Sequence, residues 1–260
     1  MRRDVAAAPG QLHLIDEGAG EPLVLLHQVP TSSTMWSAAI PGFVEAGFRV
    51  LAFDLPGYGM SDPFSSPPSL AEYASAIADG LKAIGLNHVA LVGHHTGASV
   101  GLQLAVDRPQ LVRALALWGI PLLDADFAKR LADEEPPCYD ADGSPIAAWW
   151  SWRWQMAGPL ASQRLVMRSL ADTMRAGERR AEGHWAVGQA DHTALLRAVA
   201  VPLLGMAGDR EMLAEQTRQA VALVPRACYV DLGDAGLDVV DEMPDRFVAT
   251  VVGFLRTGAA

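Results

Sequence analysis

The chain has 260 residues, of which 50% are hydrophobic and 19% charged, and its formal net charge is −10 at pH 7. This balance is typical of a globular protein, and the length suits one large α/β domain while leaving two domains open. The acidic balance excludes nucleic acid as the expected partner, because phosphate binding needs clustered Lys and Arg. No apolar run reaches about 18 residues, so we expect no membrane span.

The first residues are charged and no apolar stretch follows them, which predicts no secretory signal and a cytoplasmic protein. No two of the seven histidines stand at i, i+4 on a helix beside a suitable carboxylate, so we expect no metal. We also expect no cofactor, and a small-molecule substrate as the partner. The oligomeric state stays open, with a homodimer as one alternative.

Buried strands and amphipathic helices alternate along most of the chain. Residues 11–16 alternate polar and apolar, which predicts an early antiparallel strand. Apolar runs without alternation predict buried strands at 22–27, 49–54, 89–92, 111–118, 201–208 and 228–232. Helices are predicted at 36–46, 69–84, 98–106, 213–224 and 245–255, and the second has the capping pattern Ser69 with Glu72.

This regular pattern stops between residues 119 and 198. That region has no short buried strand, and we expect two or three helices in it. Strands alternating with helices indicate a mostly parallel central sheet covered by helices on both faces. The interruption predicts an insertion. We therefore expect an α/β core at 1–119 and 199–260, with a helical cap at 120–198.

The stretch 91–98 organises the rest of the chain. An apolar run ends at Gly93, and a second glycine, Gly97, opens a helix of small residues. This predicts strand, sharp turn and helix, with His95 at the apex beside a helix N-terminus. The pattern G-x-S-x-G describes such a nucleophile elbow, but the apex residue here is histidine. A bulky side chain at a strained positive φ costs about 1–3 kcal/mol, so we favour a functional His95 over an accidental one.

Several separated motifs resemble the α/β-hydrolase superfamily and follow one another in that family's order. They are the strand ending at His27, a D-x-P-G-x-G-x-S turn beginning at Asp54, the elbow, the strand ending in Gly208-Asp209, and the loop at 234–244. The resemblance implies the α/β-hydrolase fold with an inserted cap, and hydrolysis as the first activity to consider. We expect His27 and Asp54 to be structural.

The departures from the family pattern concern its catalytic residues. His95 stands at the family's serine position, and Leu237 stands at its histidine position. His192 is the last histidine, so no histidine reaches that site from the usual loop. Asp209 remains by type. We predict that the His95 imidazole meets Asp209, directly or through water; the alternative is an ordinary aspartate at a helix N-cap.

Other residues are predicted to surround this site. The backbone N–H groups of Gln28 and Thr96 are expected to form an oxyanion hole. His94 is expected to be a hydrogen-bonded core residue. His184, on a later cap helix, and Leu237 are predicted to contact substrate, and His184 is a candidate for the missing acid–base group. A cluster of tryptophans either buries aromatic faces in the cap or lines an apolar ligand site: Trp149, Trp150, Trp152 and Trp154.

These features favour an enzyme that hydrolyses a small, largely apolar ester, lactone or carbonyl compound. His95 would act as general base, oriented by Asp209, and no serine adduct would form. A lyase or cyclase of secondary metabolism on the same site is one alternative. A non-catalytic hydrolase fold that binds a ligand is another, because two of the three expected catalytic residues are replaced.

Overall fold

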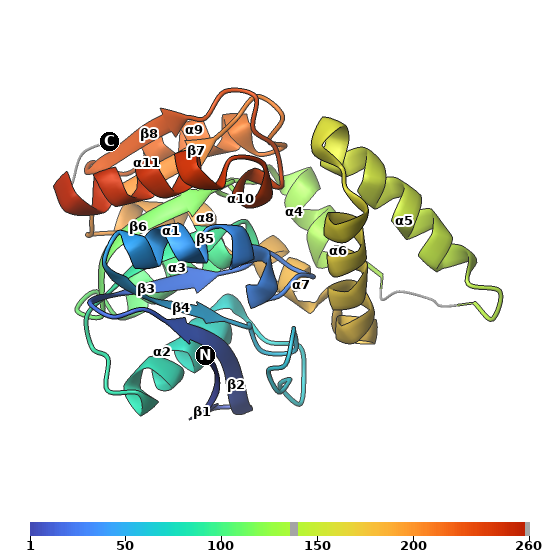
Figure 1. The fold of residues 1–260 in the computed structure, drawn as a ribbon, viewed down its shortest axis with the longest axis horizontal. Coiled ribbons are helices and arrows are strands. Elements are labelled where there is room, and N and C mark those ends of the chain that lie inside the picture. Colours follow the sequence, from blue (N-terminus) through green and yellow to red (C-terminus); the bar gives the residue numbers. More distant parts are fainter. Residues whose placement is uncertain (136–139, 258–260) are drawn as a thin grey trace.

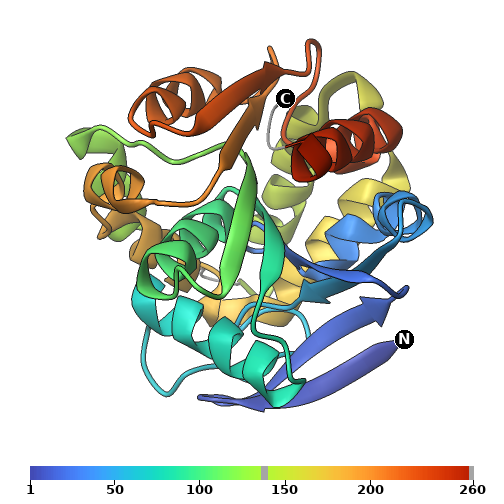
Figure 2. The ribbon, with the colours of Figure 1, turned by 90° about the vertical axis from the view of Figure 1, so that its left-hand side faces the viewer.

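Eight strands form a single sheet with helices on both faces in the computed structural model, which describes residues 1–135 and 140–257 (Figure 1, Figure 2). The strands are β1 (Arg2–Ala7), β2 (Gly10–Glu17), β3 (Glu21–Leu26), β4 (Phe48–Phe53), β5 (Val89–His94), β6 (Val112–Trp118), β7 (Leu203–Ala207) and β8 (Ala227–Asp231). Their order across the sheet is β1-β2-β4-β3-β5-β6-β7-β8. β1 is antiparallel to β2, and β2 is antiparallel to β4. All other neighbouring strands in this order are parallel. The expected α/β fold with a mostly parallel sheet is confirmed.

The central strands are apolar throughout because both of their faces are covered. Leu23 and Leu25 of β3 belong to one hydrophobic core, and Val24 and Leu26 belong to another on the opposite face. A strand buried on both sides has no exposed face, so its sequence does not alternate. Helices that contribute buried residues to the two cores include α1 (Ile40–Glu45), α2 (Leu70–Ala83), α3 (Thr96–Asp107), α9 (Ala214–Ala222), α10 (Val239–Glu242) and α11 (Pro244–Thr257).

Two helix predictions show what local sequence determines. α2 begins at the predicted capping box, where Ser69 N donates to Glu72 Oε2 at 2.8 Å and Glu72 N donates to Ser69 Oγ at 3.3 Å. The helix expected at 36–46 is instead two elements, a 3₁₀ helix η1 (Ser33–Ala38) followed by α1. Pro41 lies in the first turn of α1, where a proline is tolerated, and it does not fit the interior of a continuous helix.

Five α-helices among the described residues separate β6 from β7. They are α4 (Ala125–Ala132), α5 (Ser144–Ala157), α6 (Gln163–Ala176), α7 (Glu182–Gly188) and α8 (His192–Ala198), with 3₁₀ turns η2 (Gly158–Leu160) and η3 (Gly177–Arg179). We call α4 to α7 with their connections the helical insertion. Figure 1 shows α5 and α6 standing away from the sheet, whereas α4 packs on α7 and α8 packs on α3. None of the described helices is long and apolar enough to cross a bilayer.

Candidate active site

The turn between β5 and α3 has the geometry of a strained apex. β5 ends at His94 and α3 begins at Thr96. Between them His95 has φ 47° and ψ −107°, and it is the only non-glycine residue at positive φ in the described parts of the chain. The turn is tight because Gly97 has no side chain: a Cβ there would lie 2.1 Å from the carbonyl oxygen of Leu26. The apex is therefore at the carboxyl edge of the sheet, where ligands bind in parallel α/β folds.

The imidazole of His95 contacts a carboxylate, and that carboxylate is Glu211. His95 Nε2 lies 2.8 Å from Glu211 Oε1. Asp209, the predicted partner, is exposed, and its backbone N–H donates to Gly233 O at 2.6 Å. The predicted pairing with Asp209 is therefore wrong. The chain turns after β7, with Glu211 N donating to Gly208 O at 3.0 Å, and this turn brings a residue two positions further on towards the apex.

Glu211 is buried and accepts hydrogen bonds at both oxygens. Oε1 accepts from His95 Nε2 and from Leu213 N at 3.0 Å, and Oε2 accepts from Trp118 Nε1 at 2.7 Å. Burial alone raises the pKa of Glu211, but the charge and hydrogen bond of His95, with the Leu213 amide, lower it to about 2. An ionised carboxylate only accepts. In a neutral His95 ring the proton is therefore on Nε2 and Nδ1 is unprotonated.

The second ring nitrogen of His95 is available for chemistry. Nδ1 has no hydrogen-bond partner among the described residues and is accessible, and the side chain is 14% exposed. The ring lies over Gly119, where a Cβ would stand 2.3 Å from His95 Cδ2. Sequence reasoning missed Gly119, Trp118 and Glu211. The one signal for them was their position at or just beyond the ends of β6, which neighbours the elbow strand β5, and of β7, the next strand in the sheet.

His94 is a core residue, as expected. Its ring is fully buried and its Nε2 donates to the carbonyl oxygen of Leu237 at 2.9 Å. Burial, reinforced by the neighbouring His95, lowers the pKa of His94 to about 3, so the ring is neutral at ordinary pH. His94 therefore ties the elbow to the loop at residue 237 through this hydrogen bond.

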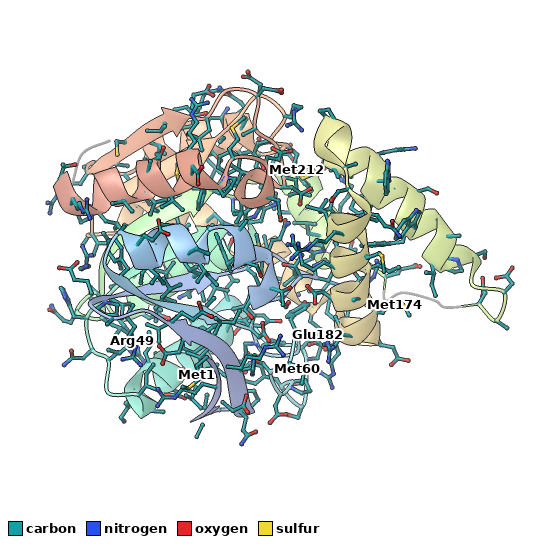
Figure 3. The ribbon with its side chains drawn as sticks, in the orientation of Figure 1. Met1, Arg49, Met60, Met174, Glu182 and Met212 are labelled. Atoms are coloured by element: carbon teal, nitrogen blue, oxygen red, sulfur yellow. The ribbon has the colours of Figure 1, made fainter. Side chains whose placement is uncertain are left out.

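A cavity of about 270 Å³ lies over the apex. The predicted site residues that line it are Gln28, His95, Thr96, Trp152, His184 and Leu237. The other lining residues are apolar: Val29, Pro30, Pro121, Leu123, Phe127, Leu131, Met156, Val187, Met212 and Leu213. Met212, labelled in Figure 3 on the side of the core that faces the helical insertion, is 52% exposed. The cavity thus lies between the core and the helical insertion.

Gln28 and Thr96 both line this cavity. Both residues are buried, at 8% and 3% exposure. No described residue accepts a hydrogen bond from either backbone N–H. Gln28 follows β3, and Thr96 is the first residue of α3, so two neighbouring segments bring these amides to the carboxyl edge of the sheet.

The four clustered tryptophans differ in what they contact. Of these four described residues, Trp152 lines the cavity and the other three do not. The Trp152 side chain is 50% exposed. Trp149 and Trp150 pack against a small cluster inside the helical insertion, and Trp150 and Trp154 have ring centroids 5.9 Å apart. All four lie on α5. A helix turns by about 100° per residue, so Trp152 points nearly opposite to Trp150 and Trp154.

His184, on α7, lines the cavity from the helical insertion. Its Nδ1 lies 2.5 Å from Glu134 Oε2, a contact that the sequence did not predict. The cavity therefore has a histidine–carboxylate pair on each side, one from the core and one from the helical insertion.

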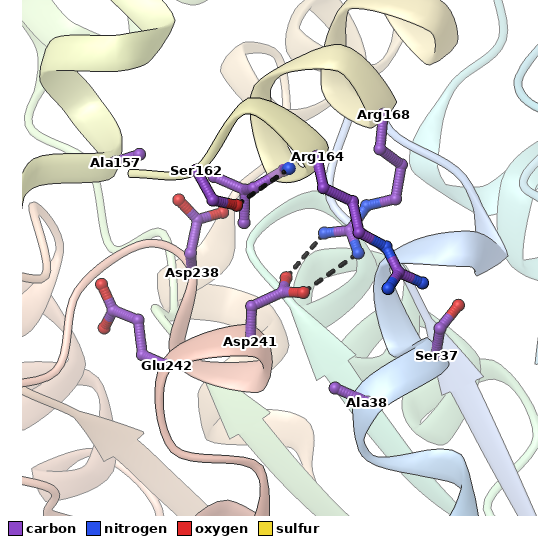
Figure 4. A pocket seen from close by; sticks show the side chains of 10 residues that line it. Ser37, Ala38, Ala157, Ser162, Arg164, Arg168, Asp238, Asp241 and Glu242 are labelled. Carbon is purple, nitrogen blue, oxygen red and sulfur yellow. Dashed lines mark hydrogen bonds and ion pairs between the residues drawn. The ribbon is translucent and has the colours of Figure 1, made fainter. Parts of the chain in front are cut away.

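Arginine–carboxylate pairs join the helical insertion to the segment that follows Leu237. In a second hollow of about 400 Å³, which we call the polar hollow, Arg168 of α6 donates to Asp241 at 3.0 and 2.6 Å (Figure 4). Beside it Arg153 of α5 is buried and donates to Asp238 at 3.0 and 2.6 Å. Because Asp238 directly follows Leu237, these pairs connect α5 and α6 to the wall of the cavity.

Comparisons with known proteins agree with this architecture. A family model described as alpha/beta hydrolase fold matches residues 21–185. Bifunctional epoxide hydrolase 2 of Rattus norvegicus is 36% identical over 125 residues, which are 46% of this chain and 22% of that protein. A 2-hydroxy-6-oxononadienedioate/2-hydroxy-6-oxononatrienedioate hydrolase of a Pseudomonas species is 31% identical over 114 residues, 42% of this chain and 40% of that protein. The matches thus span less than half the length of either relative.

Among solved structures, a hydrolase from Pseudomonas aeruginosa is similar over almost the whole chain. The two are 25% identical, the TM-score is 0.82, and 98% of each chain is covered.

Proposed function

Because this chain belongs to the α/β-hydrolase fold family, we propose that it is a hydrolase in which His95 activates water directly and no serine adduct forms. The observation that carries the proposal is the His95 ring itself. Its Nε2 is held 2.8 Å from the ionised Glu211, while its Nδ1 has no partner among the described residues. An imidazole fixed in one tautomer, with the other nitrogen accessible, suits a general base.

In the proposed reaction, His95 Nδ1 takes a proton from a water molecule as the water oxygen attacks a carbonyl carbon. The negative charge that develops on the carbonyl oxygen is stabilised by the N–H groups of Gln28 and Thr96, which act as the oxyanion hole. Glu211 stabilises the imidazolium that forms and keeps the ring in position, which is the role we first assigned to Asp209. Collapse of the tetrahedral intermediate then releases an alcohol and an acid.

The residues around the apex argue against a covalent acyl-enzyme. His95 stands at the serine position of the family pattern, and Leu237 stands at its histidine position. No serine or cysteine occurs among the described residues that line the cavity. Thr96 supplies a hydroxyl there, but the residue that would activate it is the one we assign to water. Without an activated oxygen or sulfur nucleophile, an acyl adduct is not expected.

The cavity favours a small, largely apolar ester, lactone or carbonyl compound. Its volume of about 270 Å³ and its mainly apolar lining suit such a substrate. In this proposal the helical insertion serves as a cap, with Trp152 and His184 facing the substrate from above. Leu237 contributes its side chain from the core, where a family histidine would otherwise stand.

A panel of short-chain aryl esters, alkyl esters and lactones tests the proposal. We expect the wild-type protein to turn over members of the panel without being labelled by a fluorophosphonate probe. His95→Gln should lose about 10²–10⁴-fold in kcat/KM while still binding the substrate. His88→Gln is the matched control, because His88 is exposed and precedes β5, at the end of that strand opposite His95.

Each other outcome has a distinct meaning. A probe adduct on a serine in the cavity would contradict the proposal. Binding without turnover by the wild-type protein would favour a ligand-binding hydrolase fold. Products of elimination or ring closure, lost in His95→Gln, would assign the same base to a lyase or cyclase.

A further inference from the structure

A second histidine–carboxylate pair faces the cavity from the helical insertion. His184 Nδ1 lies 2.5 Å from Glu134 Oε2, and His184 lines the cavity together with His95. Arg180 Nη2 lies 3.8 Å from the other Glu134 oxygen. Burial raises the pKa of Glu134, but His184 and Arg180 together bring it below its usual value. The carboxylate is therefore ionised, and His184 Nδ1 donates its proton to it.

The other ring nitrogen of His184 is Nε2. Nε2 has no hydrogen-bond partner among the described residues and is not a buried atom, since the side chain is 29% exposed. The loop after α4 is already tied to α7 by another bond, from Trp185 Nε1 to the Glu134 carbonyl oxygen at 2.7 Å. The side-chain pair is therefore not the only bond between these two segments. It orients the His184 ring with Nδ1 towards Glu134, and Nε2 is left without a partner among the described residues on a side chain that lines the cavity.

We propose that His184 is a second catalytic residue, the general acid that protonates the leaving oxygen, and that Glu134 is its positioning residue. The inference rests on the proposed function, because it requires a hydrolysed ester or lactone. The ionisable groups around His184 fit this role. Glu134 and Arg180 approach it from the helical insertion, and His95 with Glu211 lies on the core side of the cavity.

The proton balance of the step is complete without another reactant. The bond between the carbonyl carbon and the leaving oxygen breaks, and its electron pair stays on that oxygen. The oxygen takes the Nε2 proton from a His184 ring protonated on both nitrogens. His95 passes the proton taken from water to solvent, and His184 regains one from solvent, so both rings return to their starting states.

The test compares two esters with the same acyl group and different leaving groups. A p-nitrophenolate leaves without needing a proton, whereas an alkoxide is a poor leaving group that does. We expect His184→Gln to lower the ratio of alkyl-ester to nitrophenyl-ester kcat/KM by about 100-fold. Glu134→Gln should lower the same ratio by a smaller factor, through kcat more than through KM. His88→Gln should leave the ratio unchanged.

The possible failures separate this inference from the proposed function. If His184→Gln reduces kcat/KM for both esters by the same factor, or for neither, His184 is not the general acid. That result leaves the proposed role of His95 untouched. If the wild-type protein cleaves neither ester, the proposed function fails and this inference fails with it. A fall of the ratio in His95→Gln of the same size as in His184→Gln would also contradict the assignment of separate roles.

Discussion

The two histidine–carboxylate pairs at the cavity consist of the same chemical groups, but they differ in burial and in the elements that carry them. In the core pair, His95 lies on the strained turn after β5 and Glu211 lies in the turn after β7, and the Glu211 side chain is fully buried. The pair of the helical insertion, His184 with Glu134, is partly exposed at both members, at 29% and 27%. The ring that we propose as base therefore belongs to a pair buried in the core, whereas the ring that we propose as acid belongs to a partly exposed pair in the helical insertion.

The largest expected effect comes from Glu211→Gln. Three donors surround this carboxylate, from His95, Leu213 and Trp118. A carboxamide cannot accept from all three, because one of its atoms is itself a donor. If its NH₂ faces His95, the ring must present the unprotonated nitrogen to it and a protonated Nδ1 to the cavity. We expect kcat/KM to fall by about 10²–10⁴-fold, with about 1–3 kcal/mol lost in the free energy of unfolding.

Glu134→Gln is the matched change in the other pair. Glu134 is partly exposed, so water can bind the neighbouring polar groups that a glutamine amide at this position does not bind. We expect its effect on the free energy of unfolding to be within about 1 kcal/mol. Equal losses of stability in the two glutamine variants, measured by denaturant unfolding, would show that the two pairs are held alike.

The second expected effect concerns the attachment of the helical insertion. Asp238→Ala leaves the buried guanidinium of Arg153 unpaired, which costs about 3–5 kcal/mol in the free energy of unfolding. Asp241→Ala breaks the same kind of pair with Arg168 at a site that is a quarter exposed, and should cost about 1 kcal/mol or less. Denaturant unfolding of both variants measures the difference. A larger loss in Asp241→Ala would mean that the partly exposed pair, and not the buried pair, attaches the helical insertion.

The sequence predicted the core side of the site better than the other side. The apex at His95 followed from two glycines at the end of a buried strand, and its positive φ agrees. The carboxylate was missed by two positions, because the turn after β7 exposes Asp209 and directs Glu211 inwards. Strand patterns locate the end of a strand but do not fix which residue of the following turn points inwards.

The helical insertion had no comparable signal. Its contacts join residues far apart in the chain, as in Arg153 with Asp238 and Glu134 with His184. Such pairs depend on how helices pack and leave no local pattern. The tryptophan cluster predicted an aromatic wall, yet of its four members Trp152 alone lines the cavity, and the helical spacing turns Trp150 and Trp154 to the opposite side of α5.

The third expected effect concerns the space that Gly119 leaves for the His95 ring. A Cβ on Gly119 would overlap the ring, and Gly119 also has φ +63°. Gly119→Ala should therefore lower both the free energy of unfolding, by about 1–3 kcal/mol, and the catalytic rate. Gly85→Ala is the matched control, since Gly85 has φ +76° and nothing within 4 Å of the added Cβ. It shares the backbone strain and should leave turnover intact. Equal turnover in the two variants would contradict the placement of the ring.

The smallest expected effect is on acid stability, and it concerns the core. Burial lowers the pKa of His94 to about 3 and that of His192 to about 4, so both are neutral in the folded protein at neutral pH. The unfolded chain binds protons at these sites below about pH 6.5, and the folded chain does not. Stability is therefore greatest above that pH and falls as the pH drops, by about 1.4 kcal/mol per pH unit for each group. His192→Asn should reduce the slope between pH 6 and 4. An unchanged slope would mean that His192 is already charged in the fold.

The central claim is that Glu211 holds the proton of His95 on Nε2 and leaves Nδ1 unprotonated towards the cavity. Nitrogen-15 NMR of protein labelled in the histidine rings measures this directly at neutral pH. The account predicts that the neutral His95 ring carries its proton on Nε2 in the wild-type protein. A neutral His95 ring with its proton on Nδ1 in the wild-type protein would contradict the account, because the cavity would then face a donor instead of a base.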